Sequence, residues 1–196
     1  DGLFCSPPHH LPSPPMDFVT GHRPPDPARN AELRAKFTQL DADGSNSIED
    51  TELVMAFSTP DFEFPLSSAR MLSRLVSKDK HITFEEFCVL DEFIERCKAV
   101  FIQHDLNRDN AMQFSELVPA LQALGHTDLS IPLIQSLQRS HDPKHQMTDN
   151  MSYSAFVSVC AMLELSKKLF KQWDPSHIGC VSFNYEQLVA TLLWFL

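Results

Sequence analysis

From about residue 30 the apolar positions follow a helical period, and short polar loops interrupt them at intervals. Two apolar stretches, 87–104 and 156–173, are each 18 residues long and contain neither proline nor glycine. Each is long enough to be one helix of about 27 Å. Phenylalanine recurs four residues before the start of a loop, at Phe37, Phe101 and Phe170. We interpret these phenylalanines as core residues, and the pattern predicts an all-α protein made of helix-loop-helix repeats.

The segment that precedes the helices has a different composition. Residues 1–28 contain eight prolines, which lack an amide donor and fix their own backbone angle. Residues 1–29 are therefore predicted to be a flexible, extended segment, and residues 30–196 the folded domain. The segment is either a docking or regulatory tail or a passive linker.

The first loop, 41–52, is twelve residues long and carries oxygen-bearing groups at alternating positions. Positions 1, 3, 5, 7 and 12 are Asp41, Asp43, Ser45, Ser47 and Glu52, with Ser47 offering its backbone carbonyl. Calcium is a hard cation that takes six to eight oxygens, and this spacing is the EF-hand pattern. The loop is predicted to bind Ca²⁺.

A second loop of the same kind spans 105–116. Its candidate ligands are Asp105, Asn107, Asp109, the carbonyl of Ala111 and Glu116. Both loops lack the usual glycine at position 6 and carry Asn46 and Asn110 instead. Position 6 needs a left-handed backbone, which asparagine tolerates best among the other residues, so we expect weakened but retained calcium binding.

Three further loops fit the same frame with most ligands replaced. Loop 75–86 has Leu75 and Ser77 at positions 1 and 3, and is predicted to bind no calcium. Loop 144–155 begins with Lys144 and ends with Ala155. Loop 174–186 keeps Asp174 at position 1 but has Tyr185 at position 12 and Glu186 one residue late. The chain is thus predicted to hold five EF-hands, with long helices shared between hands 2 and 3 and between hands 4 and 5.

An odd number of hands leaves the fifth without a partner in the chain. Loops pair through the apolar residue at position 8, the first with the second and the third with the fourth. The fifth hand and its apolar C-terminal helix favour a two-fold dimer. The residues predicted to form that interface are Val181, Phe183, Tyr185, Leu188, Leu192 and Phe195.

The formal charge of -10 argues against nucleic acid and against an anionic membrane as the main partner. No apolar run reaches the roughly 20 residues that span a bilayer, so no integral membrane contact is expected. The odd count of five cysteines and the lack of a CxxC pair are typical of free thiols in a reducing compartment, which predicts a cytoplasmic protein. The sequence shows no catalytic constellation, and no enzyme activity is expected.

Five tandem hands, the shared helices and a proline-rich N-terminus resemble the penta-EF-hand (PEF) calcium-binding family. The similarity covers residues 30–196 and is strongest in 41–52, in 105–125 and in 181–187, which belongs to a fifth loop stretched by two residues. The chain resembles the group of the programmed-cell-death calcium adaptor, sorcin and the calpain regulatory domains. That resemblance implies calcium at the first and third hands, homodimers or heterodimers through the fifth hand, and calcium-dependent binding of partner proteins or peptides.

The resulting hypothesis is a calcium-sensing adaptor that opens an apolar groove when it binds Ca²⁺. Calcium-dependent recruitment to a membrane stays open. Two alternatives also stay open: a passive calcium buffer, and a regulatory domain or subunit of a calpain-like protease.

Overall fold

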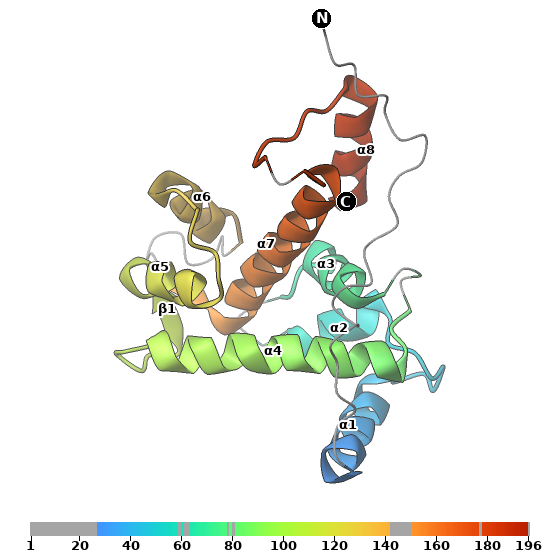
Figure 1. The fold of residues 1–196 in the computed structure, drawn as a ribbon. Coiled ribbons are helices and arrows are strands. Elements are labelled where there is room, and N and C mark those ends of the chain that lie inside the picture. The colour runs from blue at the N-terminus through green and yellow to red at the C-terminus, as the bar shows by residue number, and fades with distance from the viewer. Residues whose placement is uncertain are drawn as a thin grey trace, which may run out of the picture.

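The computed structural model describes residues 27–58, 60, 63–77, 79, 81–141, 150–176 and 178–195. Eight helices and two short strands make up this part of the chain (Figure 1). In order they are α1 (Pro27–Leu40), α2 (Asp50–Phe57), α3 (Leu66–Val76), α4 (Phe84–His104), β1 (Ala111–Gln113), α5 (Phe114–Ala123), α6 (Ile131–His141), β2 (Asn150–Ser152), α7 (Tyr153–Trp173) and α8 (Tyr185–Phe195). The predicted all-α fold of helix-loop-helix repeats is confirmed.

Helix α1 begins at Pro27, three residues before the predicted start of the folded domain. Proline suits the first helical position, because its missing N–H would have no partner there and its φ angle is already helical. The rest of the predicted N-terminal segment, residues 1–26, lies outside the described residues. The division of the chain at residue 30 stays a prediction.

The two long helices are each shared by successive hands, as predicted. Helix α4 leaves the second loop and enters the third, and α7 leaves the fourth loop and enters the fifth. Both begin three residues earlier than the apolar stretches suggest, because a hydroxyl residue caps each one. Thr83 accepts a hydrogen bond from the backbone N–H of Glu86 at 3.4 Å, and Ser152 accepts one from Ala155 at 3.3 Å.

Position 8 of the first four loops pairs the hands two by two. Ile48 and Ile82 exchange both backbone hydrogen bonds at 3.0 Å, which joins the first hand to the second. In the antiparallel strands β1 and β2, Met112 lies opposite Met151, which joins the third hand to the fourth. All four side chains are fully buried, so the pairing also builds the core.

Helix α7 crosses the middle of the molecule and connects the two pairs of hands (Figure 1). It packs closely on α3, where Ser158 and Ser68 share a hydrogen bond of 2.5 Å and Lys168 donates to the carbonyl of Leu75. That carbonyl belongs to position 1 of the second loop. None of the described helices is long and apolar enough to cross a membrane.

The core prediction for the three recurring phenylalanines is right for two of them. Phe37 and Phe101 are buried, and each packs edge-on against another aromatic ring. Phe170 is instead 45% exposed. It belongs to the helix that enters the fifth hand, which has no paired hand in this chain to cover it.

Candidate metal sites in the first and third loops

The first loop folds around its predicted ligands. Carboxylate oxygens of Asp41, Asp43 and Glu52 lie within 4.8 Å of one another. The oxygens Oδ1 and Oδ2 of Asp41 accept the backbone N–H groups of Ser45 and Asn46, both at 2.9 Å. Ser45 Oγ lies 3.0 Å from the carbonyl of Ser47, so the groups at positions 5 and 7 face the same space. All five predicted residues are therefore brought together, and their oxygens match the ligand set of a hard cation.

The third loop repeats this arrangement. Asp105 accepts the N–H groups of Asp109 and Asn110 at 3.2 and 3.0 Å. Asn107 donates its amide to Asp109 Oδ2 at 2.9 Å, and Asp109 Oδ1 accepts the N–H of Ala111 at 2.9 Å. The Asp109 carboxylate is thus held by its own loop. In the described part of the chain, close convergence of three acidic residues occurs in the first loop and not in this one.

Asparagine supplies the left-handed backbone at position 6 of both loops. Asn46 has φ of 62° and Asn110 has φ of 60°. Position 4 is left-handed as well, with Gly44 at 72° and Arg108 at 57°. The predicted conformation of the two asparagines is confirmed, so both turns close without glycine at position 6. Arg108 is the less expected case, since a long side chain rarely adopts this conformation.

The glutamate at position 12 closes each loop and also caps the helix that follows. Glu52 Oε1 accepts the N–H of Ala42 at 2.7 Å, and Oε2 accepts the N–H of Glu49 at 2.9 Å. Glu116 makes the equivalent bonds to Leu106 and Gln113, both at 3.0 Å. Each carboxylate therefore ties the start of its loop to the start of its exiting helix, so any movement of the glutamate is passed on to that helix.

Two residues with a part in this closure were not identified from the sequence. Glu49 and Gln113 occupy position 9 and are the N-caps of α2 and α5. They lie three residues before Glu52 and Glu116, which is the spacing of a capping box, and this spacing could have identified them from the sequence. The usual first residue of that motif is serine or threonine, and neither stands here.

Several acidic groups of these loops are buried with no basic partner in the part of the chain that the structure describes. Glu52 and Glu116 are 6% exposed and Asp105 is 9% exposed. None of the three forms an ion pair with a basic side chain of the described residues. Burial of a carboxylate is costly unless a charge compensates it. At the exposed Asp43, hydrogen bonds from the backbone and then the side chain of Ser45 lower the pKa, which keeps this carboxylate ionised.

The second loop is occupied by its own side chains. Ser77 Oγ donates to the carbonyl of His81 at 2.8 Å and accepts the N–H of Asp79 at 3.3 Å. Position 1 offers only Leu75, whose carbonyl is bonded to Lys168. Among the described residues of this loop, the Ser77 hydroxyl and the Leu75 carbonyl are thus engaged within the protein itself. In the fourth loop, Lys144 lies outside the described residues and Ala155 is fully buried.

The fifth loop keeps the backbone turn but ends later than the sequence indicates. Asp174 is buried and accepts the N–H groups of Ile178 and Gly179 at 2.9 and 2.7 Å, as at position 1 of the other loops. Helix α8 is capped by Asn184 and Gln187, which exchange hydrogen bonds of 3.0 and 2.8 Å. Gln187 therefore takes the place of the closing glutamate. The twelve-residue frame that puts Tyr185 at position 12 does not hold here, because the loop is two residues longer.

The fifth hand presents an apolar surface to solvent. Exposure is 75% at Ile178, 41% at Phe183, 83% at Tyr185, 46% at Leu188 and 57% at Leu192, and Val181 is half-buried. Phe183 packs on Trp173 with ring centroids 5.3 Å apart. The side chain of Phe195, also predicted for the interface, lies outside the described residues. The described members of the predicted set thus share one hand and are open to a partner.

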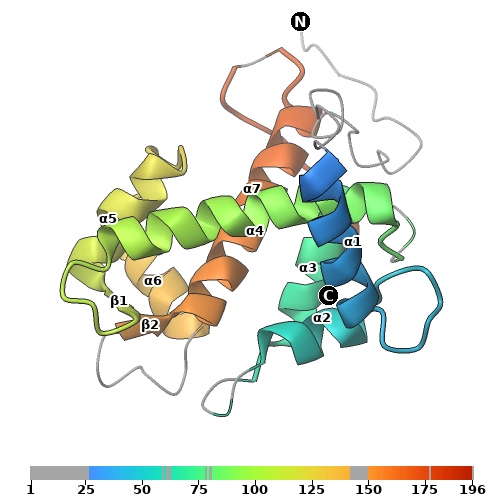
Figure 2. The ribbon, with the colours of Figure 1, turned by 90° about the horizontal axis from the view of Figure 1, so that it is seen from below.

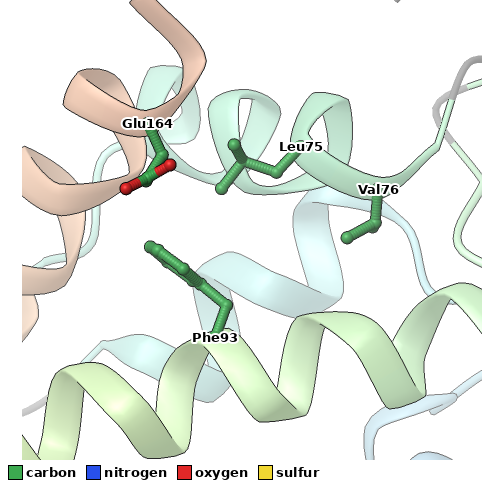
Figure 3. Close-up of a pocket in the computed structure, with 4 residues that line it drawn as sticks. All are labelled: Leu75, Val76, Phe93 and Glu164. Carbon is green, nitrogen blue, oxygen red and sulfur yellow. The ribbon is translucent and has the colours of Figure 1, made fainter. Parts of the chain in front are cut away.

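A small hollow lies between α3, α4 and α7. Leu75, Val76, Phe93 and Glu164 line it, and Glu164 and Phe93 point into the same space (Figure 3). Glu164 Oε1 also lies 3.4 Å from Nε2 of the buried His126. Burial lowers the pKa of His126, against the opposing effect of Glu164. This pocket is too small to hold a peptide in the conformation described.

The relatives found by sequence comparison include calcium-binding proteins and penta-EF-hand proteins, as the geometry of the loops suggests. No protein-family model matches the chain. It is 27% identical over 172 residues to probable calcium-binding protein CML50 of Arabidopsis thaliana, and the match covers 87% of this chain and 48% of that protein. It is 26% identical over 176 residues to peflin of Homo sapiens, covering 88% and 61%. It is 27% identical over 161 residues to penta-EF hand domain-containing protein 2 of Dictyostelium discoideum, covering 80% and 75%.

The chain spans about half to three fifths of the length of the first curated relatives that it matches. Among solved structures it resembles a homologue of programmed cell death 6 protein from Leishmania major. The TM-score is 0.61 and the identity 25%, and the match covers 85% of this chain and 95% of that one. The relatives, the described loops and the two shared helices agree, and the chain resembles the penta-EF-hand proteins.

Proposed function

We propose that this protein is a calcium-binding regulator that holds Ca²⁺ in loops 41–52 and 105–116. The observation that carries the proposal is the set of buried carboxylates, Glu52, Asp105 and Glu116, that have no positive partner among the described residues. A bound calcium ion would supply the missing charge, and oxygens are the ligands it prefers. The names of several relatives include calcium binding, which supports the same assignment.

The ligands proposed for the first site are Asp41, Asp43, Ser45, the carbonyl of Ser47 and Glu52. For the third site they are Asp105, Asn107, Asp109, the carbonyl of Ala111 and Glu116. If each glutamate offers both oxygens, each loop offers six, which meets the lower limit for calcium. Two filled sites change the formal charge from -10 to -6. We expect affinities in the sensor range of about 10⁻⁷–10⁻⁵ M.

The response to calcium is proposed to begin at the two closing glutamates. Glu52 and Glu116 lie in the first turns of α2 and α5 and accept the N–H groups of the N-cap residues, so a movement of either carboxylate reorients its exiting helix. Rotation of these helices would widen the small hollow beside Phe93 or open a comparable apolar groove for a partner segment. The function is thus proposed as regulation through a partner protein, with no catalytic step of its own.

The exposed apolar face of the fifth hand is proposed to pair with the fifth hand of a second chain, either the same protein or another penta-EF-hand protein. Tyr185 and Leu192, at 83% and 57% exposure, would be buried by that contact. Position 8 of this loop, Val181, would pair as Ile48 pairs with Ile82. Gln187 in place of a glutamate gives the fifth hand no closing carboxylate.

The test is calcium-dependent binding of a hydrophobic dye to the wild type and to the double variant Glu52→Gln with Glu116→Gln. A sensor shows a calcium-induced rise in dye fluorescence that the double variant loses. The matched control is Glu86→Gln, because Glu86 caps α4 in the same way but belongs to a loop without the other ligands. Calcium binding without a change in dye signal would instead indicate a buffer, and absence of calcium binding would refute the proposal.

A further inference from the structure

A buried carboxylate on α4 is held by two basic residues of α1. Asp91 is 6% exposed and lies in the first half of α4. Its Oδ2 accepts from Arg29 Nη2 at 2.5 Å, and its Oδ1 accepts from Lys36 Nζ at 3.1 Å. Both oxygens of this one side chain are therefore used to bind a helix whose contacting residues lie 62 and 55 positions earlier in the sequence. Lys36 also lies 3.6 Å from Glu95, one turn further along α4.

The two contacts fix how α1 lies on α4. Arg29 and Lys36 are seven residues apart on α1, which places them on one face about two turns apart. If α1 slides along α4 or turns about its own axis, at least one of the two bonds to Asp91 breaks. An aromatic contact secures the same face, with the ring centroid of Phe37 5.7 Å from that of Phe84 and 5.6 Å from that of Phe87.

Both helices lead directly into the intact loops. The N–H of Asp41, at the end of α1, is bonded to the carbonyl of Phe37 at 2.9 Å. The N–H of Asp105, at the end of α4, is bonded to the carbonyl of Phe101 at 2.9 Å. In two views the first and third loops lie near opposite ends of α4, and α1 lies against the half of α4 that carries Asp91 (Figures 1 and 2).

We propose that Asp91 joins α1 and α4 into one frame that carries both loops, so that calcium binding at one site strengthens binding at the other. This inference rests on the proposed calcium sites and adds their linkage. Because Asp91 holds the two helices together, a shift of α1 that accompanies ion binding in the first loop carries α4 and the third loop with it, and the reverse. Asp91 touches neither set of ligands, so its role is that of a positioning residue.

The charges around Asp91 support an attachment that persists near neutral pH. Burial opposes the charge of Lys36, but the hydrogen bond and the attraction from Asp91 outweigh it and raise the pKa of Lys36. The pKa of Arg29 is raised too, first by its hydrogen bond to Glu32 and then, against burial, by attraction to Asp91. Both side chains therefore stay positively charged near neutral pH, as their bonds to Asp91 require.

The experiment is calorimetric calcium titration of the wild type, Glu52→Gln and Glu116→Gln, each repeated in an Asp91→Asn background. The single variants give the affinity of one site alone, and the wild type gives both sites together. The linkage factor is the product of the two association constants of the wild type, divided by the product of the association constants that the two single variants give. We expect about fivefold or more with Asp91 present, which is the lower end of ordinary coupling, and less than about twofold in the Asp91→Asn background.

The control is Glu32→Gln, which loses contacts of 3.0 Å to Arg29 and 3.7 Å to Lys36 without touching α4. It should keep the linkage. If Asp91→Asn fails to fold, as judged by circular dichroism, Lys36→Gln serves in its place. The Lys36 side chain is 35% exposed, so this change removes one of the two bonds to Asp91 without disturbing the core, and it should still reduce the linkage factor. Independent sites in the wild type, or an undiminished factor without Asp91, would overturn the inference. Absence of calcium binding in the wild type would refute the proposed function first.

Discussion

Replacing Ile82 by alanine tests whether the second loop stabilises the first without binding metal. Ile82 is fully buried and exchanges two backbone hydrogen bonds of 3.0 Å with Ile48. The substitution leaves those backbone groups in place and removes three carbons from the core. At about 0.8 kcal/mol for each buried carbon the transfer loss is about 2.4 kcal/mol, and the cavity adds to it. We expect the free energy of unfolding to fall by about 3 kcal/mol.

The assay is urea unfolding in the presence of a calcium chelator, so that stability is measured apart from metal binding. Ile82→Val removes one carbon and should cost about 1 kcal/mol. Ile102→Ala is the matched control, because the side chain of Ile102 is 66% exposed and the change should cost less than about 0.5 kcal/mol. The reasoning would be refuted if Ile82→Ala cost no more than Ile102→Ala.

The fifth hand, a buried histidine and a left-handed glycine give three further predictions. Leu192→Asp should convert a dimer into a monomer of 22.3 kDa in sedimentation equilibrium, while Leu133→Asp, on the exposed face of α6, should leave the dimer intact. A monomeric wild type would contradict the proposed pairing. Because burial lowers the pKa of His126 below its ordinary 6.5, the unfolded chain takes up this proton more readily, so stability falls as the pH drops below about 6.5. His126→Gln should flatten that fall in urea unfolding at several pH values, and an unchanged slope would count against it. Gly125 has φ of +88°, and an added Cβ would meet only Lys167 Nζ at 3.7 Å. Gly125→Ala should therefore lower the free energy of unfolding by about 1–2 kcal/mol through backbone strain alone, measured by the same unfolding assay.

Much of the loop geometry could be predicted because it is local. The ligand spacing places Asp41 and Glu52 at the two ends of one twelve-residue turn, and any chain that closes this turn brings their oxygens together. The left-handed backbone at Asn46 and Asn110 follows from the same closure. Pairing of Ile48 with Ile82 could also be predicted, since a lone loop leaves an unpaired strand and neighbouring hands supply the partner.

Other features depend on contacts between distant segments, which spacing does not reveal. In the sequence Asp91 looks like an ordinary polar residue of a helix. Its role depends on Arg29 and Lys36, which contact it only in the folded protein. Phe170 repeats the position of Phe37 and Phe101, but among the described residues no other loop pairs with its hand. The two-residue stretch of the fifth loop could be predicted from the sequence, but the hydrogen bonds by which Gln187 closes the loop could not.

Calcium titration by calorimetry of the wild type, of Glu52→Gln and Glu116→Gln separately, and of the double variant tests the central claim most directly. The account predicts two sites in the wild type, one in each single variant and none in the double variant, with Glu86→Gln keeping both. Binding of calcium by the double variant with unchanged stoichiometry, or no binding by the wild type, would contradict the claim that loops 41–52 and 105–116 are the calcium sites.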